Sequence, residues 1–238
     1  MDDLDHFDLT RPATAARPLL GLTVLLVEDS RFASDAMRLL CLRSGARIRR
    51  ADSLHSAGRH LQVYRPSVAI VDLGLPDGSG AELIGELVRA TPRVGIVLGI
   101  SGDPSGEAAA RAAGADGFLE KPVTRLAIFQ EAILSRLPED RRPEGPRLVE
   151  EEKVRPDPLA YADDMAHAAE LLTEGQPEAE LDYIAQFLHS VGQSAGDQPL
   201  LDEVEALSRA RLQGRPVRSE LARVAGLIQA RLAQAEPI

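Results

Sequence analysis

The sequence predicts two domains: an α/β domain built on a five-stranded parallel sheet, and a smaller all-α domain behind it. Across residues 21–137, apolar runs typical of strands buried on both faces alternate with amphipathic helical patterns. Residues 138–156 combine prolines with mixed charge, which is typical of an extended linker. Residues 157–238 show helical apolar periodicity only, and residues 1–20 show none. We therefore expect a mobile tail, a doubly wound domain, a linker and a helical bundle.

Composition limits the function classes. The 238 residues carry a net charge of −10 and one cysteine, Cys41, so no internal disulfide is possible. No apolar run approaches the roughly 18 residues of a membrane span, and the acidic N-terminus is unlike a basic signal peptide, so we expect a cytoplasmic protein with no membrane partner. Residues 157–238 hold 14 acidic and 6 basic side chains. Because DNA binding needs the opposite balance, we expect no DNA partner there.

The stretch from Val68 to Gly80 organises the first domain. Its first five residues are apolar until Asp72, as in a buried strand that delivers one carboxylate to its C-terminal end. Pro76 and the glycines that follow it then break the strand. Ligands of open α/β sheets bind outside the carboxyl ends of the strands, which makes Asp72 a candidate functional group. The alternative is that Asp72 only caps the following turn.

The other elements follow in order along the chain. A buried strand at 22–27 ends in Glu28-Asp29-Ser30, and an amphipathic helix at 31–44 stops at Gly45. The pattern then predicts a strand at 46–51, a helix at 53–64, the Asp72 strand, a helix near 81–90, a strand at 94–100, a helix at 105–113, a strand at 116–120 and a helix at 124–137. Alternating strands and helices predict right-handed crossovers but leave the strand order open.

Polar groups gather where these strands end. The set consists of Glu28, Asp29, Asp72, Ser101 and Lys121. Adjacent carboxylates repel each other unless a cation or several donors lie between them, and oxygen ligands suit Mg²⁺. A cap on the next helix is an alternative role for Asp29 or Ser30. Only two of the 27 basic residues are lysines, which suggests that Lys121 does chemistry that arginine would not suit. Asp72 could then attack a phosphoryl group and form an acyl phosphate.

With these residues in order, residues 21–137 resemble the receiver domain of bacterial two-component response regulators, the CheY-like family with a flavodoxin-like fold. The resemblance implies that Asp72 is the phosphoacceptor and that a sensor histidine kinase or phosphotransfer protein is the donor. It implies no enzymatic activity beyond self-catalysed phosphoryl transfer and hydrolysis. The implied cofactor is Mg²⁺, which Asp29 would bind directly and Glu28 mainly through water, with Asp72 and the backbone carbonyl of Gly74 as the other implied ligands.

The resemblance also assigns the residues that respond to phosphorylation. It implies that Lys121 pairs with the phosphoryl group and that the hydroxyl of Ser101 turns toward it. Phe118 takes the place of the aromatic side chain that swings inward with Ser101, and Pro122 follows a cis peptide bond. Gly74 and Asp103 stand at positions that modulate hydrolysis in this family, so the lifetime of the phosphorylated state stays open.

Proline and glycine mark helix boundaries in residues 157–238. Prolines 158, 177, 199 and 216 open apolar-periodic runs, and glycines 175, 192 and 214 close the first three. This pattern predicts four short helices in an antiparallel bundle, which we expect to signal to an unknown protein target. Because a bundle of this size buries little surface, we also expect a homodimer.

A phosphorelay is the alternative function. The helix around His189 faintly resembles that of histidine phosphotransfer domains, which are also four-helix bundles. His189 lies off the apolar stripe, so it should be exposed, as a phospho-accepting imidazole must be. However, Gly192 and Gln193 stand where that family has a cation and a small residue, and Gly192 is expected to end the helix.

Overall fold

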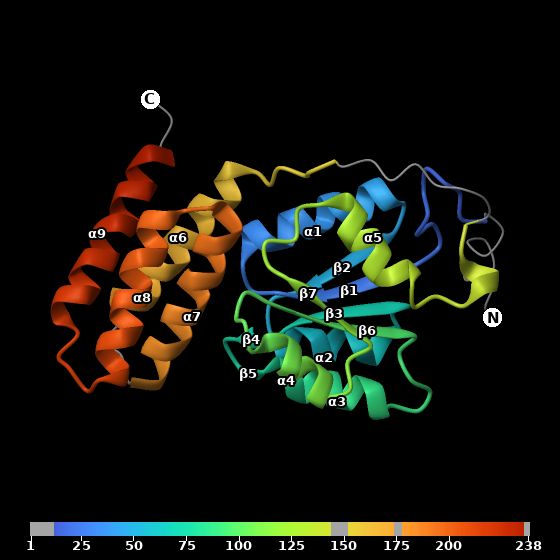
Figure 1. Ribbon diagram of the computed structural model, residues 1–238, viewed down its shortest axis with the longest axis horizontal. Coiled ribbons are helices and arrows are strands. Elements are labelled where there is room, and N and C mark those ends of the chain that lie inside the picture. Colours follow the sequence, from blue (N-terminus) through green and yellow to red (C-terminus); the bar gives the residue numbers. More distant parts are fainter. Residues whose placement is uncertain (1–11, 144–151, 174–177, 236–238) are drawn as a thin grey trace. The chain divides into compact units, whose positions relative to one another are not determined.

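The computed structural model describes residues 12–143, 152–173 and 178–235, which fall into two compact units (Figure 1). The first unit contains the chain up to Asp29 together with Ala36–Arg155, and the second contains Ser30–Asp35 together with the chain from Pro156 onward. The residues of each unit are therefore nearly those of one predicted domain. The exception is Ser30–Asp35, at the start of a helix predicted in the α/β domain, which belongs to the second unit. Within the described ranges, no helix is long and apolar enough to cross a membrane.

The first unit is built on a five-stranded parallel sheet. Its strands are β1 (Thr23–Val27), β2 (Arg47–Ala51), β3 (Val68–Asp72), β6 (Ile96–Ser101) and β7 (Gly117–Glu120). Their order is β2-β1-β3-β6-β7, which is the doubly wound, flavodoxin-like order and confirms the predicted fold class. Two further short strands, β4 (Gly74–Leu75) and β5 (Gly78–Ser79), form a separate antiparallel pair.

Helices cover both faces of this sheet (Figure 1). One face is covered by α1 (Arg31–Ser44) and α5 (Leu126–Leu134), and the other by α2 (Leu54–Val63), α3 (Gly80–Arg89) and α4 (Gly106–Ala112). Two core clusters follow from this layering: Met37 and Phe129 belong to the first, and Ile84 and Ala110 to the second. Every residue of β3 is buried, because the central strand is covered from both sides.

The tail and the linker are shorter than the sequence predicted. Pro18 and Leu19 are buried, and the backbone N–H of Leu19 donates to the carbonyl of Ser44 over 2.9 Å. In the linker, Glu139–Arg141 form a 3₁₀ turn, and residues 152–154 pack on the first unit, where Val154 is 6% exposed. In both segments, a few apolar side chains within a polar stretch are buried in the core. The composition of the segment does not show which of its side chains are buried. Residues 1–11 and 144–151 lie outside the described ranges.

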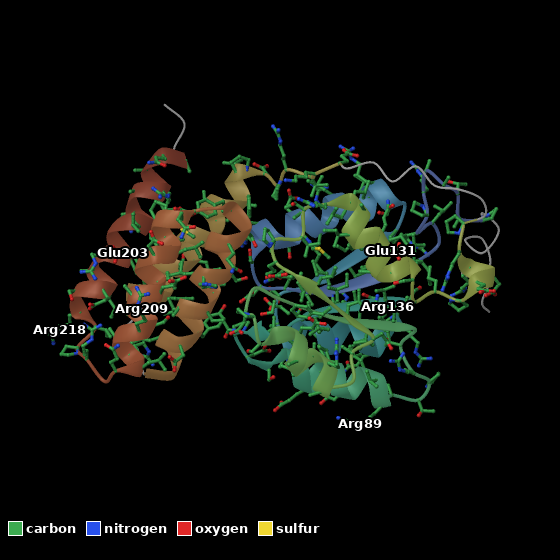
Figure 2. The ribbon with its side chains drawn as sticks, viewed as in Figure 1. Arg89, Glu131, Arg136, Glu203, Arg209 and Arg218 are labelled. Carbon is green, nitrogen blue, oxygen red and sulfur yellow. The ribbon has the colours of Figure 1, made fainter. Side chains whose placement is uncertain are left out.

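The end of α5 is fixed by an arginine. Arg136, labelled in Figure 2, donates from Nε to the carbonyl of Asp116 over 2.5 Å and from Nη1 to the carbonyl of Ala132 over 2.8 Å. Arg136 is exposed, and these two bonds tie the last turn of α5 to the residue before β7, the strand that carries Phe118.

The second unit is a bundle of helices. Its long helices are α6 (Pro158–Thr173), α7 (Glu178–Ala195), α8 (Gln198–Leu212) and α9 (Arg218–Ala235). Their core residues lie in the apolar-periodic runs that the sequence predicted and include Met165, Ile184, Phe187, Val191, Leu200, Val204, Leu207, Val224 and Ile228. In the same unit, the carboxylate of Asp164 accepts hydrogen bonds from the Ser30 hydroxyl and the Arg31 backbone N–H, each over 2.7 Å. Gly175 and Pro177, predicted at the first boundary, lie outside the described residues.

The prediction that Gly192 ends its helix is wrong. α7 continues to Ala195, and Gly196, with a φ of 69°, takes the left-handed conformation that follows the helix end. A Cβ atom at Gly192 would lie 3.1 Å from Cδ2 of Leu201 on α8. This glycine therefore permits close packing of two helices, a role that is indistinguishable from a helix stop in the sequence.

Asp197 joins three of the bundle helices. Its carboxylate caps α8 through the N–H of Leu200, accepts the Tyr161 hydroxyl of α6 over 2.6 Å, and pairs with both Nε and Nη2 of Arg231 on α9 at 2.6 and 2.9 Å. The Arg231 and Tyr161 donors outweigh partial burial and lower the pKa of Asp197 to about 2. Its charged form is therefore part of the stability of the bundle.

Replacing Asp197 with asparagine should destabilise the protein by about 1–3 kcal/mol at neutral pH, because charge-assisted hydrogen bonds are lost. The lowered pKa in the folded state means that the stabilisation is complete above the unfolded pKa near 4 and is lost as pH falls toward 2. The gap between the variant and the wild type should close over that window in urea unfolding followed by circular dichroism. Asp202→Asn, an exposed change on the same helix, is the control. Equal stability of Asp197→Asn and wild type at pH 7 would contradict this account.

Candidate functional site

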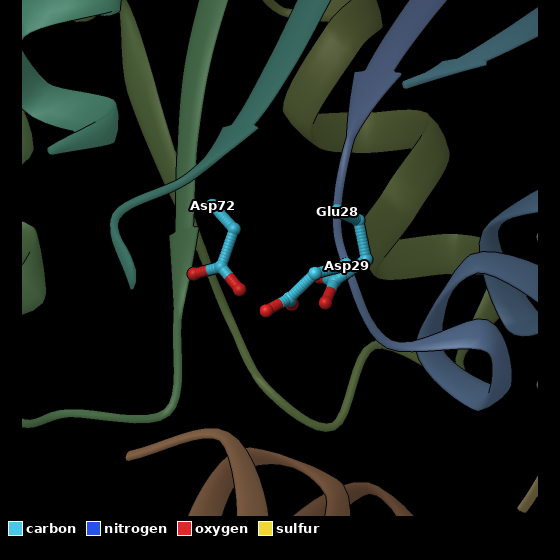
Figure 3. Close-up of side chains that lie close together, drawn as sticks. All are labelled: Glu28, Asp29 and Asp72. Carbon is cyan, nitrogen blue, oxygen red and sulfur yellow. The ribbon is translucent and has the colours of Figure 1, made fainter. Parts of the chain in front are cut away.

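Three carboxylates meet at the C-terminal edge of the sheet (Figure 3). Glu28 and Asp29 follow β1 and Asp72 ends β3, and because Val27 pairs with Val71 in parallel register, the two strand ends lie side by side. One carboxylate oxygen from each residue lies within 4.8 Å of the others. Glu28 and Asp72 are buried, and Asp29 is half-buried. Each carboxylate thus has an oxygen that can face a common centre.

Lys121 supplies the positive charge at this edge. Its Nζ lies 2.7 Å from Oε2 of Glu28 and 2.7 Å from Oδ2 of Asp72, and its side chain is 1% exposed. The backbone N–H of Lys121 donates to the carbonyl of Ser101 over 2.9 Å, which continues the pairing of β7 with β6. The peptide bond from Lys121 to Pro122 is cis, the arrangement that the family resemblance implied.

Burial and mutual charge set the ionisation of this cluster. Burial raises the pKa of Glu28, and the neighbouring charges of Asp72 and Asp29 raise it further, against the lowering effect of Lys121. Burial alone would lower the pKa of Lys121, but Asp72 and Glu28 outweigh it, so that the pKa is raised and the ammonium stays charged. One ammonium therefore lies against two carboxylates, Glu28 and Asp72, and the carboxylate of Asp29 lies near these two.

Oxygen chemistry and charge both fit a hard divalent cation. Carboxylate oxygens are the ligands that Mg²⁺ prefers, and Glu28, Asp29 and Asp72 offer three of them within a small space. Gly74 lies next to this site: its backbone N–H donates to Oδ1 of Asp72 over 3.2 Å. The ligand role implied for the Gly74 carbonyl stays a prediction.

Ser101 and Phe118 lie next to each other beside the carboxylates. Ser101 is the last residue of β6, beside Ile100, which pairs with Asp72, and its hydroxyl accepts a hydrogen bond from the N–H of Asp103 over 3.1 Å. A Cβ atom at Gly106 would lie 2.8 Å from Cβ of Ser101 and 3.2 Å from Cζ of Phe118. Gly106 therefore leaves the space in which these two side chains sit. The sequence signalled this role only by a glycine at the start of a helix.

The loop after Asp72 depends on two residues that the sequence analysis did not single out as functional. A Cβ atom at Gly80 would lie 1.8 Å from the backbone oxygen of Asp72, so that only glycine lets α3 start this close to the strand. Asp77 accepts hydrogen bonds from the N–H groups of Leu54 and His55 at 2.8 and 2.9 Å, which caps α2. The loop is thus held at both ends.

His189 does not have the exposure that the phosphorelay alternative required. It lies on α7 in the second unit and is half-buried, where the apolar stripe had predicted an exposed imidazole. α7 runs past it for six further residues because Gly192 does not end the helix. The predicted site residues 28, 29, 72, 101, 118 and 121 share one region of the first unit, and His189 belongs to the other unit.

Known proteins are similar to this chain in sequence. The family described as the response regulator receiver domain matches residues 24–133. The KDP operon transcriptional regulatory protein KdpE of Escherichia coli is 30% identical over 190 residues, which cover 76% of this chain and 79% of that protein. The transcriptional regulatory protein KdpE of Mycobacterium tuberculosis is 34% identical over 99 residues, 42% of this chain and 44% of that protein.

A solved structure of similar description is the CheY-like response regulator receiver domain protein from Methanospirillum hungatei. It is 23% identical, covers 50% of this chain and 95% of that chain, and has a TM-score of 0.44. The receiver-domain match and the relationship to E. coli KdpE across most of both chains show that this chain belongs to the response regulators of two-component signalling.

Proposed function

We propose that Asp72 accepts a phosphoryl group from the histidine of a sensor kinase or phosphotransfer protein, and that the helical unit passes the signal to a protein target. The observation that carries this proposal is the position of Asp72, whose carboxylate lies beside two further carboxylates and 2.7 Å from a buried ammonium. A nucleophile, a set of hard oxygen ligands and a fixed cation are the parts that phosphoryl transfer to a carboxylate needs.

The transfer balances without any further reactant. A carboxylate oxygen of Asp72 forms a bond to phosphorus while the bond from phosphorus to the donor imidazole nitrogen breaks, and that nitrogen keeps the electron pair. Lys121, 2.7 Å from Oδ2 of Asp72, is placed to pair with the oxygens of the transferred group. Hydrolysis of the resulting acyl phosphate resets the site. We propose no enzymatic activity beyond this self-catalysed acceptance and hydrolysis.

Mg²⁺ is the proposed cofactor. Glu28, Asp29 and Asp72 would hold it, with the Gly74 carbonyl as a further ligand. When bound, the ion offsets the negative charge that a phosphoryl group brings to three carboxylates. Without it, Lys121 alone would face that charge, and electrostatic repulsion would oppose transfer.

The switch that we propose starts at Ser101. Its hydroxyl accepts a hydrogen bond from the N–H of Asp103, and we propose that the hydroxyl rotates toward a phosphoryl oxygen when Asp72 is phosphorylated. Phe118 is half-buried and, like Ser101, adjoins Gly106, so that it can follow Ser101 inward. The result is a change at the outer edge of β7, a surface that a partner can detect.

The output of the chain is proposed from its relatives and from the charge of its C-terminal segment. E. coli KdpE is named a transcriptional regulatory protein, which supports a role in gene control for this chain as well. The C-terminal segment 157–238 carries 14 acidic and 6 basic residues, and this charge opposes contact with a phosphate backbone. We therefore propose a protein target rather than DNA, and a cytoplasmic location, where kinase and target are both available.

The phosphorelay alternative needs His189 to accept the phosphoryl group from Asp72. Its partial burial and its place within an unbroken α7 do not favour this role. The alternative stays testable by the chemistry of the linkage, because acyl phosphates survive acid better than phosphohistidine, and phosphohistidine survives base better.

Labelling with acetyl phosphate and Mg²⁺ tests the phosphoacceptor. Asp72→Asn should abolish labelling because the amide cannot form the acyl phosphate, and Asp29→Asn should slow it by about 10-fold or more because a metal ligand is lost. Asp52→Asn, at an exposed aspartate of the same unit, should label like the wild type. Full labelling of Asp72→Asn would rule out Asp72 as the phosphoacceptor. If His189→Gln is labelled as fast as the wild type, and neither protein carries a base-stable phosphate, the relay alternative is wrong.

The charge balance around Lys121 gives a second prediction. Lys121→Met should reduce the free energy of unfolding by about 3–5 kcal/mol, because it leaves two buried carboxylates without their cation. The double variant Lys121→Met/Asp72→Asn should be more stable than Lys121→Met alone, since one of those charges is then removed. Lys153→Met, at the other lysine, is the matched control. Urea unfolding measures these proteins together with Asp72→Asn alone, and additive effects of Lys121→Met and Asp72→Asn would contradict the coupling.

Dimerisation is the third expectation. We propose that the helical units pair constitutively and that the receiver surface around Phe118 and α5 responds to phosphorylation. Exposed side chains such as Ile128 of α5, which is 52% exposed, are available on that surface. Sedimentation of the full chain with and without beryllofluoride, a phosphoryl analogue, should show a dimer in both states at micromolar concentration. A monomer in both would refute the proposal.

A further inference from the structure

Residues 152–154 return to the first unit and pair with the beginning of α5. Arg125 and Lys153 form an antiparallel bridge. On either side of it, the N–H of Leu126 donates to the carbonyl of Glu152 and the N–H of Val154 donates to the carbonyl of Thr124, each over 2.9 Å. Two backbone hydrogen bonds therefore join this segment, which we call the strap, to the residues that lead into α5.

Side chains fasten the strap independently of the backbone. Val154 is 6% exposed and belongs to the same core cluster as Val123 and Phe129. The carboxylate of Glu152 pairs with the guanidinium of Arg43 in the last turn of α1. Since the surface ion pair contributes little by itself, the buried valine and the two backbone bonds account for most of the attachment.

The residues under the strap continue directly from the functional site. Only Pro122 and Val123 separate Lys121 from Thr124, and Val123 is buried. Lys121 is itself held at both ends, by its N–H on the Ser101 carbonyl and by its Nζ on Glu28 and Asp72. Because only two residues connect Lys121 to the segment that pairs with the strap, we expect the two to move together. A displacement of residues 124–126 would displace the ammonium of Lys121, and a displacement of the ammonium would displace the strap.

We propose that the strap is a positioning element for Lys121, and that occupation of the phosphoacceptor site in turn changes how tightly the strap is held. The inference rests on the proposed function, because it assigns a regulator to that site. Coupling of this kind is reciprocal: if the strap favours one placement of Lys121, then a ligand that favours another placement loosens the strap. Pro158, the first residue of α6, lies four residues beyond Val154, so that the strap is also where the chain leaves for the helical unit.

Hydrogen exchange of the wild-type protein tests whether occupation of the phosphoacceptor site changes how tightly the strap is held. With Mg²⁺ present, beryllofluoride should change the exchange rates of the Leu126 and Val154 amides by about 5-fold or more, because both bonds belong to the strap. The amide of Arg47, bonded to the Leu22 carbonyl at the far edge of the sheet, should change less than either. If the strap only stabilises the fold, the Leu126 and Val154 rates would change no more than the Arg47 rate, and that outcome overturns the proposal.

The rate of phosphoryl acceptance tests whether the strap positions Lys121. The double variant Glu152→Ala/Val154→Ala should be labelled by acetyl phosphate about 3- to 10-fold more slowly than the wild type, since small misplacements of a charged group are costly in transfer reactions. Glu152→Gln, which keeps Val154 and the backbone bonds, should slow labelling less, and Lys153→Ala, at an exposed strap residue, should not slow it. Circular dichroism at the assay temperature checks that each variant is folded.

The outcomes separate the two proposals. A wild type that labels on Asp72, with a folded double variant that labels equally fast, overturns the strap and leaves the proposed function intact. A wild type that does not label overturns the proposed function and the strap with it. Slow labelling by Lys153→Ala equal to that of the double variant also overturns the strap, because the effect would not then depend on the groups that attach it. If the double variant does not fold, Glu152→Gln and wild-type exchange decide the question.

Discussion

The ammonium of Lys121 between two buried carboxylates is the interaction on which the site depends. Glu28 and Asp72 are almost fully removed from water, and each lies 2.7 Å from Nζ. Two such charges at one sheet edge would repel each other in a medium where little water screens them. The lysine makes their approach tolerable, yet with Asp29 nearby the balance stays negative. That residual charge fits the hard cation proposed for this site, so that the charge balance of Glu28, Asp72 and Lys121 and the proposed function involve the same residues.

Parallel strand order places these groups. β1, β3 and β6 are neighbours, and β7 continues the sheet, so that the carboxyl ends of four strands deliver acids, a hydroxyl and a cation to one edge. Apolar side chains on both faces fix the strands, and glycines allow the close approaches around them. Gly80 permits α3 to begin against the backbone of Asp72, and Gly106 leaves room for Ser101 and Phe118. Packing thus fixes the positions from which polar side chains act.

The helical unit obeys simpler rules and carries fewer functional signals. Its core follows the apolar stripes, and a single carboxylate, Asp197, ties α6, α8 and α9 together through Tyr161 and Arg231. Neither feature points to a ligand. The linker is more informative than its composition suggests, because residues 152–154 form a strap on the first unit beside the loop that carries Lys121. The described part of the linker therefore pairs with the segment that follows Lys121 in the chain.

The sequence by itself determined the fold class, the five strands and the polar groups at their ends. Buried strands have a continuous apolar pattern, and polar residues at their carboxyl ends must share an edge in a parallel sheet. It could not determine the strand order, the packing role of Gly192, the partial burial of His189 or the attachment of Leu19 and Val154. These depend on contacts between residues that are distant in the chain or on neighbouring helices, such as Gly192 with Leu201. Local periodicity reports which face of an element is apolar, and only the tertiary structure decided what lies against that face.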